Sequence, residues 1–170
     1  MSDRGLPTGD ITMPGLETVR AVVAAMDDAG IETAVGGSGL LAALGLADRV
    51  RDWDVTTDAE PSAVCAALTS HGIPYTVQPA AEGRYATKGR LRVDGGDHDI
   101  DIIVGFAVRT VDRIVELPTR ITGHWLGLPL ADPAVWAHAY RAIGRPDRAA
   151  TLDAWLRGAS ADAHGDRSAQ

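Results

Sequence analysis

The sequence predicts an α+β fold, in which a mixed β-sheet is flanked by helices and followed by a C-terminal helical region. Apolar residues recur every three or four positions in several segments, as they do on one face of a helix. Short apolar runs between these segments predict strands, and the sequence Asp-Gly-Gly-Asp at 94–97 separates two of them as a hairpin turn. Further helical periodicity begins at Asp132-Pro133. These features together favour a mixed sheet rather than a regular βα repeat.

The expected elements follow one another along most of the chain. Residues 1–13 are polar and are expected to be a flexible tail, after which Pro14 opens a helix that Gly30 ends. The other expected elements are strands at 31–35, 51–56, 73–79, 84–93 and 97–106, and helices at 40–46, 58–72, 132–143 and 146–157. We expect a main unit at 14–130, a helical region at 131–158 and a disordered polar tail at 159–170.

Composition limits the kinds of protein that this chain can be. Of its 170 residues, 45% are hydrophobic and 23% are charged, which is typical of a globular protein. The formal net charge of -7 disfavours general binding to nucleic acid. The single cysteine, Cys65, is expected to be a buried thiol. The sequence shows neither a membrane span nor a signal peptide, so we expect a cytoplasmic protein.

The segment Ala34–Asp58, AVGGSGLLAALGLADRVRDWDVTTD, contains the first chemically informative pattern. Side chains alternate between the two faces of a strand, so Asp52 and Asp54 share one face while Trp53 and Val55 face the core. Two neighbouring carboxylates repel each other and lose hydration, which is costly without a cation. Mg²⁺ prefers such hard oxygen ligands, and bound phosphates can complete its coordination.

A later strand offers a third carboxylate. In DHDIDIIVGF, Asp97, Asp99 and Asp101 share one face, opposite a set of apolar side chains. Three convergent carboxylates can hold paired metal ions that activate an attacking oxygen and neutralise a leaving phosphate. The Gly-Gly-Ser turn at 36–38 can present backbone N–H groups to triphosphate oxygens. The pattern therefore indicates a metal-dependent site for a nucleoside triphosphate.

Two other interpretations of the glycine turn stay open. The residues from Gly37 to Ala42 fit the dinucleotide-binding pattern G-x-G-x-x-A, and Asp58 lies about twenty residues further on, as that pattern requires. Against it, the following strand carries its acidic residues near its start, and no run of βα units follows. The turn and the aspartates could also be ordinary surface features, because Gly-Gly pairs and exposed Asp residues are common in loops.

Taken together, these motifs resemble the DNA polymerase β-type nucleotidyltransferase superfamily. The resemblance rests on VGGSGLLAALGL, on RDWDV thirteen residues after Ser38, and on DIDIIVGF in a later strand. It is greatest for compact bacterial members of the antibiotic nucleotidyltransferase or AbiEii toxin type, whose C-terminal helices carry a "GR…D" segment. Here that segment is YRAIGRPDRAATLDAWL, and the resemblance runs roughly from Ile31 to Leu156.

The resemblance implies an activity and a set of site residues. It implies that Gly36, Gly37 and Ser38 bind nucleotide phosphates, that Asp52 and Asp54 bind Mg²⁺ or Mn²⁺, and that Asp101 is the third catalytic carboxylate and metal ligand. Asp99 is a rival for that last role because it points the same way. Arg145, flanked by Arg141 and Arg148, is expected to help with nucleotide binding.

The implied reaction is transfer of a nucleoside monophosphate from an NTP to a hydroxyl of an unknown acceptor, which could be a small molecule, a tRNA end or a protein. A cognate protein partner is also possible in such families. The alternative is a catalytically degenerate member of the fold that binds a nucleotide or a partner protein without chemistry.

Some residues outside these motifs have two interpretations. Arg84, Lys88, Arg90 and Arg92 alternate along the first hairpin strand, where they could hold an acidic substrate or simply solvate a strand edge. His98 is expected to be a turn histidine, and Trp136 to belong to the core.

Overall fold

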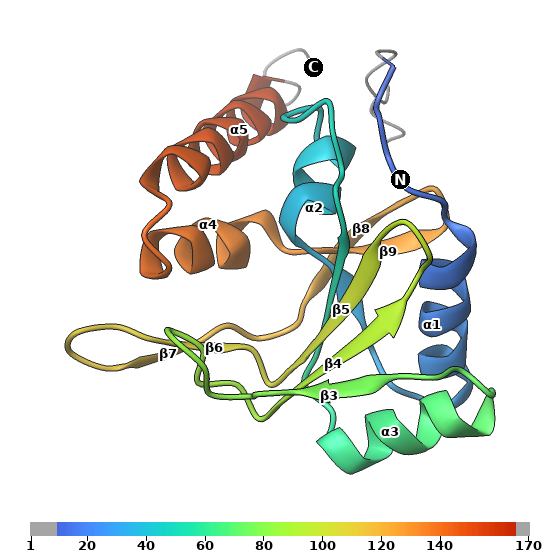
Figure 1. Ribbon diagram of the computed structural model, residues 1–170. Helices are drawn as coiled ribbons and strands as arrows, with labels where there is room; N and C mark the ends of the chain where they lie inside the picture. Colours follow the sequence, from blue (N-terminus) through green and yellow to red (C-terminus); the bar gives the residue numbers. More distant parts are fainter. Residues whose placement is uncertain (1–9, 166–170) are drawn as a thin grey trace.

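A seven-stranded mixed sheet organises the computed structural model, which describes residues 10–165 (Figure 1). The strands lie in the order β3-β4-β5-β2-β1-β9-β8, and β6 and β7 form a separate two-stranded sheet. The strands are β1 (Ala34–Val35), β2 (Trp53–Thr57), β3 (Thr76–Gln78), β4 (Gly89–Asp94), β5 (Asp99–Val104), β6 (Ala107–Arg109), β7 (Ile114–Glu116), β8 (Ile121–Trp125) and β9 (Leu128–Ala131). The α+β class that the sequence predicts is confirmed.

Helices lie on both sides of this sheet. They are α1 (Glu17–Asp28), α2 (Gly37–Ala43), α3 (Pro61–Ser70), α4 (Pro133–Ala142) and α5 (Pro146–Gly165). Figure 1 shows α1 and α3 next to each other, away from the pair formed by α4 and α5. No helix in the described part of the chain has an apolar stretch long enough to cross a bilayer.

The centre of the sheet is the parallel pair β2 and β5. Their register places Trp53 beside Ile100 and Asp54 beside Asp101. Trp53 and Ile100 are fully buried, while the two aspartates on the opposite face are only half-buried. The alternation expected from the sequence is therefore present, and burial of the apolar face directs the acidic residues to the other face.

The hairpin expected at 94–97 joins β4 to β5. Its turn is closed by the Gly95 N–H, which donates to the His98 carbonyl oxygen at 2.9 Å, and Gly96 takes a positive φ of 95°. His98 lies in this turn, as expected, but its side chain is buried, with Nδ1 2.7 Å from Asp97 Oδ1. The first hairpin strand begins only at Gly89, so Arg84 and Lys88 precede it.

Other elements differ from those expected. Strands β6 to β9 fill residues 107–131, for which the sequence analysis predicts no element. Helix α5 extends to Gly165 rather than to Arg157, because its last turns are rich in alanine, a strong helix former. Thr12 pairs with the segment before β2 through its N–H and carbonyl groups, so residues 10–13 are not a free tail. The expectations for 1–9 and 166–170 lie outside the described residues.

The thiol of Cys65 also departs from expectation, since this residue of α3 is free and only half-buried. Its neighbours on the helix that point to the core, Val64 and Leu68, are fully buried. Cys65 therefore lies at the border of the apolar face of α3 rather than within it.

Helix α4 is fixed to the glycine turn by an aromatic side chain. The Asp132 carboxylate caps the helix by accepting the Ala134 N–H at 2.8 Å. Trp136 is buried against Gly36, so closely that a Cβ atom at position 36 would overlap the indole ring. The ring of Trp136 also contacts Phe106, with centroids 5.4 Å apart. The turn before α2 and the start of α4 therefore pack as one unit.

Replacing Gly36 with Ala should destabilise the protein by about 1–3 kcal/mol, because the new methyl group would overpack the Trp136 ring. The loss should be smaller when the substitution is made in a Trp136→Leu background, since the smaller side chain leaves room for the methyl group. Urea unfolding of the two single variants and the double variant measures this coupling. Gly15→Ala is the control, because a Cβ atom there meets nothing within 4 Å. Strictly additive effects would show that the two residues do not share this contact.

Candidate active site

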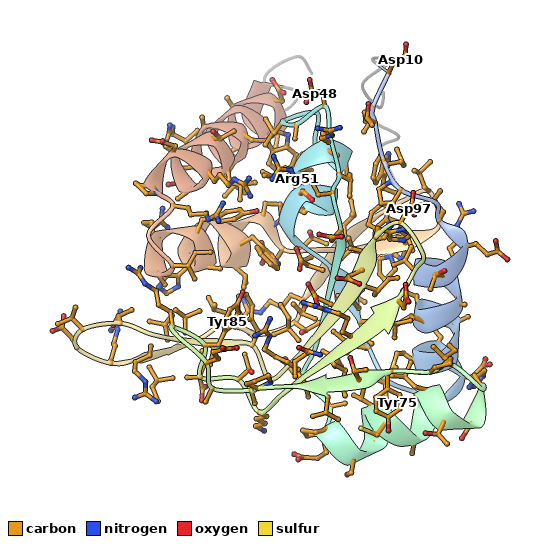
Figure 2. All side chains as sticks on the ribbon, viewed as in Figure 1. Asp10, Asp48, Arg51, Tyr75, Tyr85 and Asp97 are labelled. Carbon is orange, nitrogen blue, oxygen red and sulfur yellow. The ribbon has the colours of Figure 1, made fainter. Side chains whose placement is uncertain are left out.

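Most of the site residues predicted from the sequence line one cleft. Its volume is about 260 Å³, and it lies between the β2–β5 face of the sheet and the helix pair α4–α5. The lining residues are Gly37, Ser38, Arg51, Asp52, Asp54, Tyr85, Asp101, Ile103, Phe106, Trp136, Tyr140, Ile143, Arg145 and Arg148. Figure 2 shows Arg51 on the connection between α2 and β2 and Tyr85 on the loop below α4. Of the candidate residues named from the sequence, Gly36, Asp97, Asp99, Arg141 and the four basic residues at 84–92 do not line this cleft.

The glycine turn forms the wall of the cleft beside Asp54. The Gly36 N–H donates to the Asp54 carbonyl oxygen at 2.9 Å, which ties the turn to β2. Gly37 has a φ of 56°, and a Cβ atom there would collide with Asp54 Oδ2. Only glycine combines this backbone conformation with so close an approach to a carboxylate. Gly36 serves a different purpose, because it makes room for Trp136.

Asp54 is the most perturbed acid in this cleft. Its pKa is raised from 3.8 to about 7, first by burial and then by the nearby carboxylates of Asp101 and Asp52. Arg90 and Arg148 act in the opposite direction and lower its pKa. The Asp54 carboxylate forms no hydrogen bond or ion pair with the described residues, so a bound cation would be its natural partner.

The carboxylate of Asp101 is already paired. Arg92, which lies opposite it on β4, donates from Nε to Asp101 Oδ1 at 3.1 Å. The same Nε lies 3.5 Å from Asp99 Oδ2. The backbone N–H of Asp99 donates to Asp52 Oδ1 at 3.0 Å. Asp101 therefore faces Asp54 inside the cleft, while Asp99 lies outside it and braces Arg92 and Asp52.

The carboxylates of Asp52, Asp54 and Asp101 are the kind of ligand that a divalent cation prefers, but their oxygens do not converge on one point. Three carboxylates open into a single cleft, where burial and then repulsion by Asp101 and Asp52 raise the pKa of Asp54. Within residues 10–165, however, no three His, Cys, Asp or Glu side chains are placed close enough to hold a metal ion. Asp52, Asp54 and Asp101 are the residues that would hold Mg²⁺ or Mn²⁺ there.

Arginine and tyrosine side chains complete the cleft. Arg51, Arg145 and Arg148 are its basic lining residues, and all three are exposed. The Arg148 guanidinium lies over the Tyr140 ring, 5.5 Å from its centroid. The Tyr140 hydroxyl is buried and has no hydrogen-bond partner among the described residues. A ligand with acceptor oxygens, such as a polyphosphate, could use both kinds of group.

The sequence analysis does not predict several of these residues. Arg51 is next to Asp52 in the chain, but the strand alternation alone directs it to the opposite face. Tyr85 and Tyr140 have no motif that marks them. Trp136 is buried as expected and also lines the cleft. Only its position after the capped start of α4 could have suggested that it faces the glycine turn.

Comparison with known proteins identifies the fold. No family model matches the sequence, and no curated protein matches it. The structure is similar to that of a candidate nucleotidyltransferase from Thermotoga maritima, with a TM-score of 0.60 and 20% identity over 84% of this chain and 92% of that chain. The chain therefore has the DNA polymerase β-type nucleotidyltransferase fold, as predicted from its motifs.

Two structures of ANT(2'')-Ia also match. One is its complex with adenylyl-2''-tobramycin, with a TM-score of 0.49 and 13% identity over 84% of this chain and 97% of that chain. The other is the solution structure of this antibiotic-resistance factor, with a TM-score of 0.48 and 14% identity over 89% of this chain and 97% of that chain.

The raised pKa of Asp54 predicts how stability depends on pH. The folded protein holds this proton up to about pH 7, whereas the unfolded chain releases it near pH 3.8. Ionised Asp54 therefore destabilises the fold, increasingly so as the pH rises between these values. Asp54→Asn should stabilise the metal-free protein at pH 8 by an amount on the order of 1–4 kcal/mol, and by less at pH 5.

Urea unfolding at both pH values measures this effect. Asp112→Asn, at an exposed position between β6 and β7, is the control and should change little. Equal stabilisation by Asp54→Asn at pH 5 and pH 8 would contradict the raised pKa of Asp54.

Proposed function

We propose that this protein is a Mg²⁺- or Mn²⁺-dependent nucleotidyltransferase, which moves a nucleoside monophosphate from an NTP to a hydroxyl of an acceptor. The observation that carries this proposal is the arrangement of Asp52, Asp54 and Asp101 in one cleft with Gly37 and Ser38. Neither an ordinary surface turn nor a dinucleotide-binding turn explains why three carboxylates face the same space. The nucleotidyltransferase fold supports the same conclusion.

The phosphates would be held on the α2 side of the carboxylates. The first turn of a helix leaves backbone N–H groups without intrahelical partners, and here those groups belong to Gly37 and its neighbours. The Ser38 hydroxyl and the guanidinium groups of Arg51, Arg145 and Arg148 line the same cleft. These donors match the negative charge of a triphosphate, although the chain as a whole is acidic.

In the proposed reaction, the acceptor oxygen attacks the α-phosphorus and the bond to the β-phosphate oxygen breaks, so that pyrophosphate leaves. The acceptor proton would pass to Asp101, which faces Asp54 across the paired strands. Bound divalent cations would supply Lewis-acid stabilisation of the charge that develops on the phosphate oxygens. Asp54 must lose its proton to serve as a ligand, so occupancy of the site should increase as the pH rises toward and above 7.

A non-catalytic protein of the same fold is the second candidate. The pairing of Arg92 with Asp101 favours it, because a carboxylate that stays neutralised by arginine serves poorly as a ligand and proton acceptor. Such a protein would bind a nucleotide, or a cognate protein partner, without transfer. The two candidates differ in whether labelled nucleotide becomes attached to an acceptor. We expect that acceptor to be a small molecule, a tRNA end or a protein, and we expect no general nucleic-acid binding.

Replacing both Asp52 and Asp54 with Asn should abolish metal-dependent NTP binding and lower transfer at least about a hundredfold, because several kcal/mol of charge stabilisation are lost. Calorimetric titration of each NTP, with and without Mg²⁺, measures binding and identifies the preferred base. Near-native unfolding behaviour of the double variant is the control for folding. Transfer that survives in the variant would overturn the metal assignment. Binding without any detectable transfer in the wild type would favour the non-catalytic candidate.

A further inference from the structure

The two sides of the carboxylate cluster differ in what they offer a ligand. The helix α2, whose first-turn N–H groups would hold phosphate, follows β1, whereas β5 and β4 continue the sheet on the other side of β2. In phosphoryl transfer the attacking and leaving oxygens lie roughly in line with the phosphorus atom between them. An acceptor would therefore approach Asp101 over the face formed by β5 and β4. This step rests on the proposed function.

Strand β4 places two arginines on that face. Arg92 lies opposite Asp101 and Arg90 lies opposite Ile103 in the β4–β5 register. Both arginines are half-buried, and they share the face of Asp101 because side chains two residues apart point the same way. One interpretation of the sequence places these arginines on a solvated strand edge. In the structure β4 is not an edge strand, because β3 pairs with it on its other side.

The two arginines differ in their partners. Arg92 is occupied by Asp101 and Asp99, at 3.1 and 3.5 Å. Among the described residues, no carboxylate lies within ion-pair distance of Arg90. Its guanidinium instead lies over the ring of Tyr85, 4.4 Å from the centroid. Tyr85 lines the cleft, so this cation–π contact holds the guanidinium next to the cleft without neutralising its charge. The N–H groups at the edge of a stacked guanidinium can still donate to an oxyanion.

The acidic residues of β4 and β5 all have partners. Asp99 and Asp101 share Arg92, and Asp94 Oδ1 accepts the Gly96 N–H at 2.8 Å in the hairpin turn. With Asp52 and Asp54 assigned to the metal, a cationic acceptor would therefore find an unpaired arginine and no free carboxylate on β4 and β5. A phosphorylated acceptor would find a fixed guanidinium, whose donors match phosphate oxygens in a bidentate geometry.

We infer that the acceptor is a small hydroxyl compound that carries a phosphate group, and that Arg90 binds this phosphate while the hydroxyl lies beside Asp101. Arg90 is then a specificity-determining residue for the acceptor. Arg90 and Asp101 lie on neighbouring strands. The acceptor must therefore be long enough for its phosphate to reach Arg90 while its hydroxyl lies beside Asp101.

The test uses matched acceptors that differ in charge. The wild-type protein is first saturated with Mg²⁺ and a non-hydrolysable analogue of its preferred NTP, which fills the triphosphate site. Calorimetry then compares glucose 6-phosphate, ribose 5-phosphate and glycerol 3-phosphate with glucose, ribose and glycerol, and with the cationic sugar glucosamine. Parallel assays follow transfer of labelled nucleotide from the NTP to each compound and to a short RNA with a free 3′-hydroxyl.

We expect at least one phosphorylated compound to bind at least about tenfold more tightly than its neutral counterpart, and Arg90→Met to remove that preference. Arg90→Lys should retain part of it, because lysine keeps the charge but loses the fork of donors. Arg113→Met, at an exposed turn between β6 and β7, is the matched control and should leave the preference unchanged.

Several results would overturn the inference. These are equal or tighter binding of the neutral or cationic compounds, no binding of any member of the panel, a phosphate preference that survives Arg90→Met, and transfer to RNA alone. Failure of the proposed function itself is recognised separately, because the wild-type protein would then bind no NTP in the first titration.

Discussion

The parallel pairing of β2 with β5 is the constraint on which the site depends. Its register buries Trp53 and Ile100 on one face and thereby places Asp54 beside Asp101 on the other. A slip of one residue would direct the carboxylates into the core. Burial of the apolar face therefore keeps Asp54 next to Asp101, although the two negative charges repel each other. Two features accommodate this pair of carboxylates. Gly37 has no side chain that would collide with Asp54, and Arg92 on the neighbouring strand donates to Asp101.

The sequence predicts the elements before and after residues 107–131 better than the strands within that segment. Helices α1 and α3 and strands β2, β4 and β5 have clear periodicity or turn signals, and all are present. Strand β9, with the sequence LPLA, is buried on both faces and contains a proline, so it lacks the alternation that marks a half-buried strand. Strand β8 is largely exposed and is interrupted by a glycine. Neither pattern is distinctive in sequence.

The site divides in a similar way. Motif spacing is sufficient to select the residues that line the cleft from α2, β2 and β5, because each motif is local in the chain. The family resemblance selects Asp101, but the sequence keeps Asp99 as a rival because the two share a strand face. In the structure their partners differ, since Arg92 donates to Asp101 and the Asp99 N–H donates to Asp52. Arg51, Tyr85 and Tyr140 converge from three separate elements. Convergence of this kind is a property of tertiary packing, and no local pattern encodes it.

Strand β1 is only two residues long, yet it joins the two halves of the sheet. It pairs antiparallel with β2 and parallel with β9, where Val35 lies beside Leu130. During synthesis the ribosome must therefore release the chain through β9, nearly one hundred residues after β1, before this sheet can close. Such non-local pairing slows folding and leaves the edge of β1 open in the nascent protein. Until β9 has been made, that edge can pair with another chain, so the order of synthesis exposes this protein to aggregation.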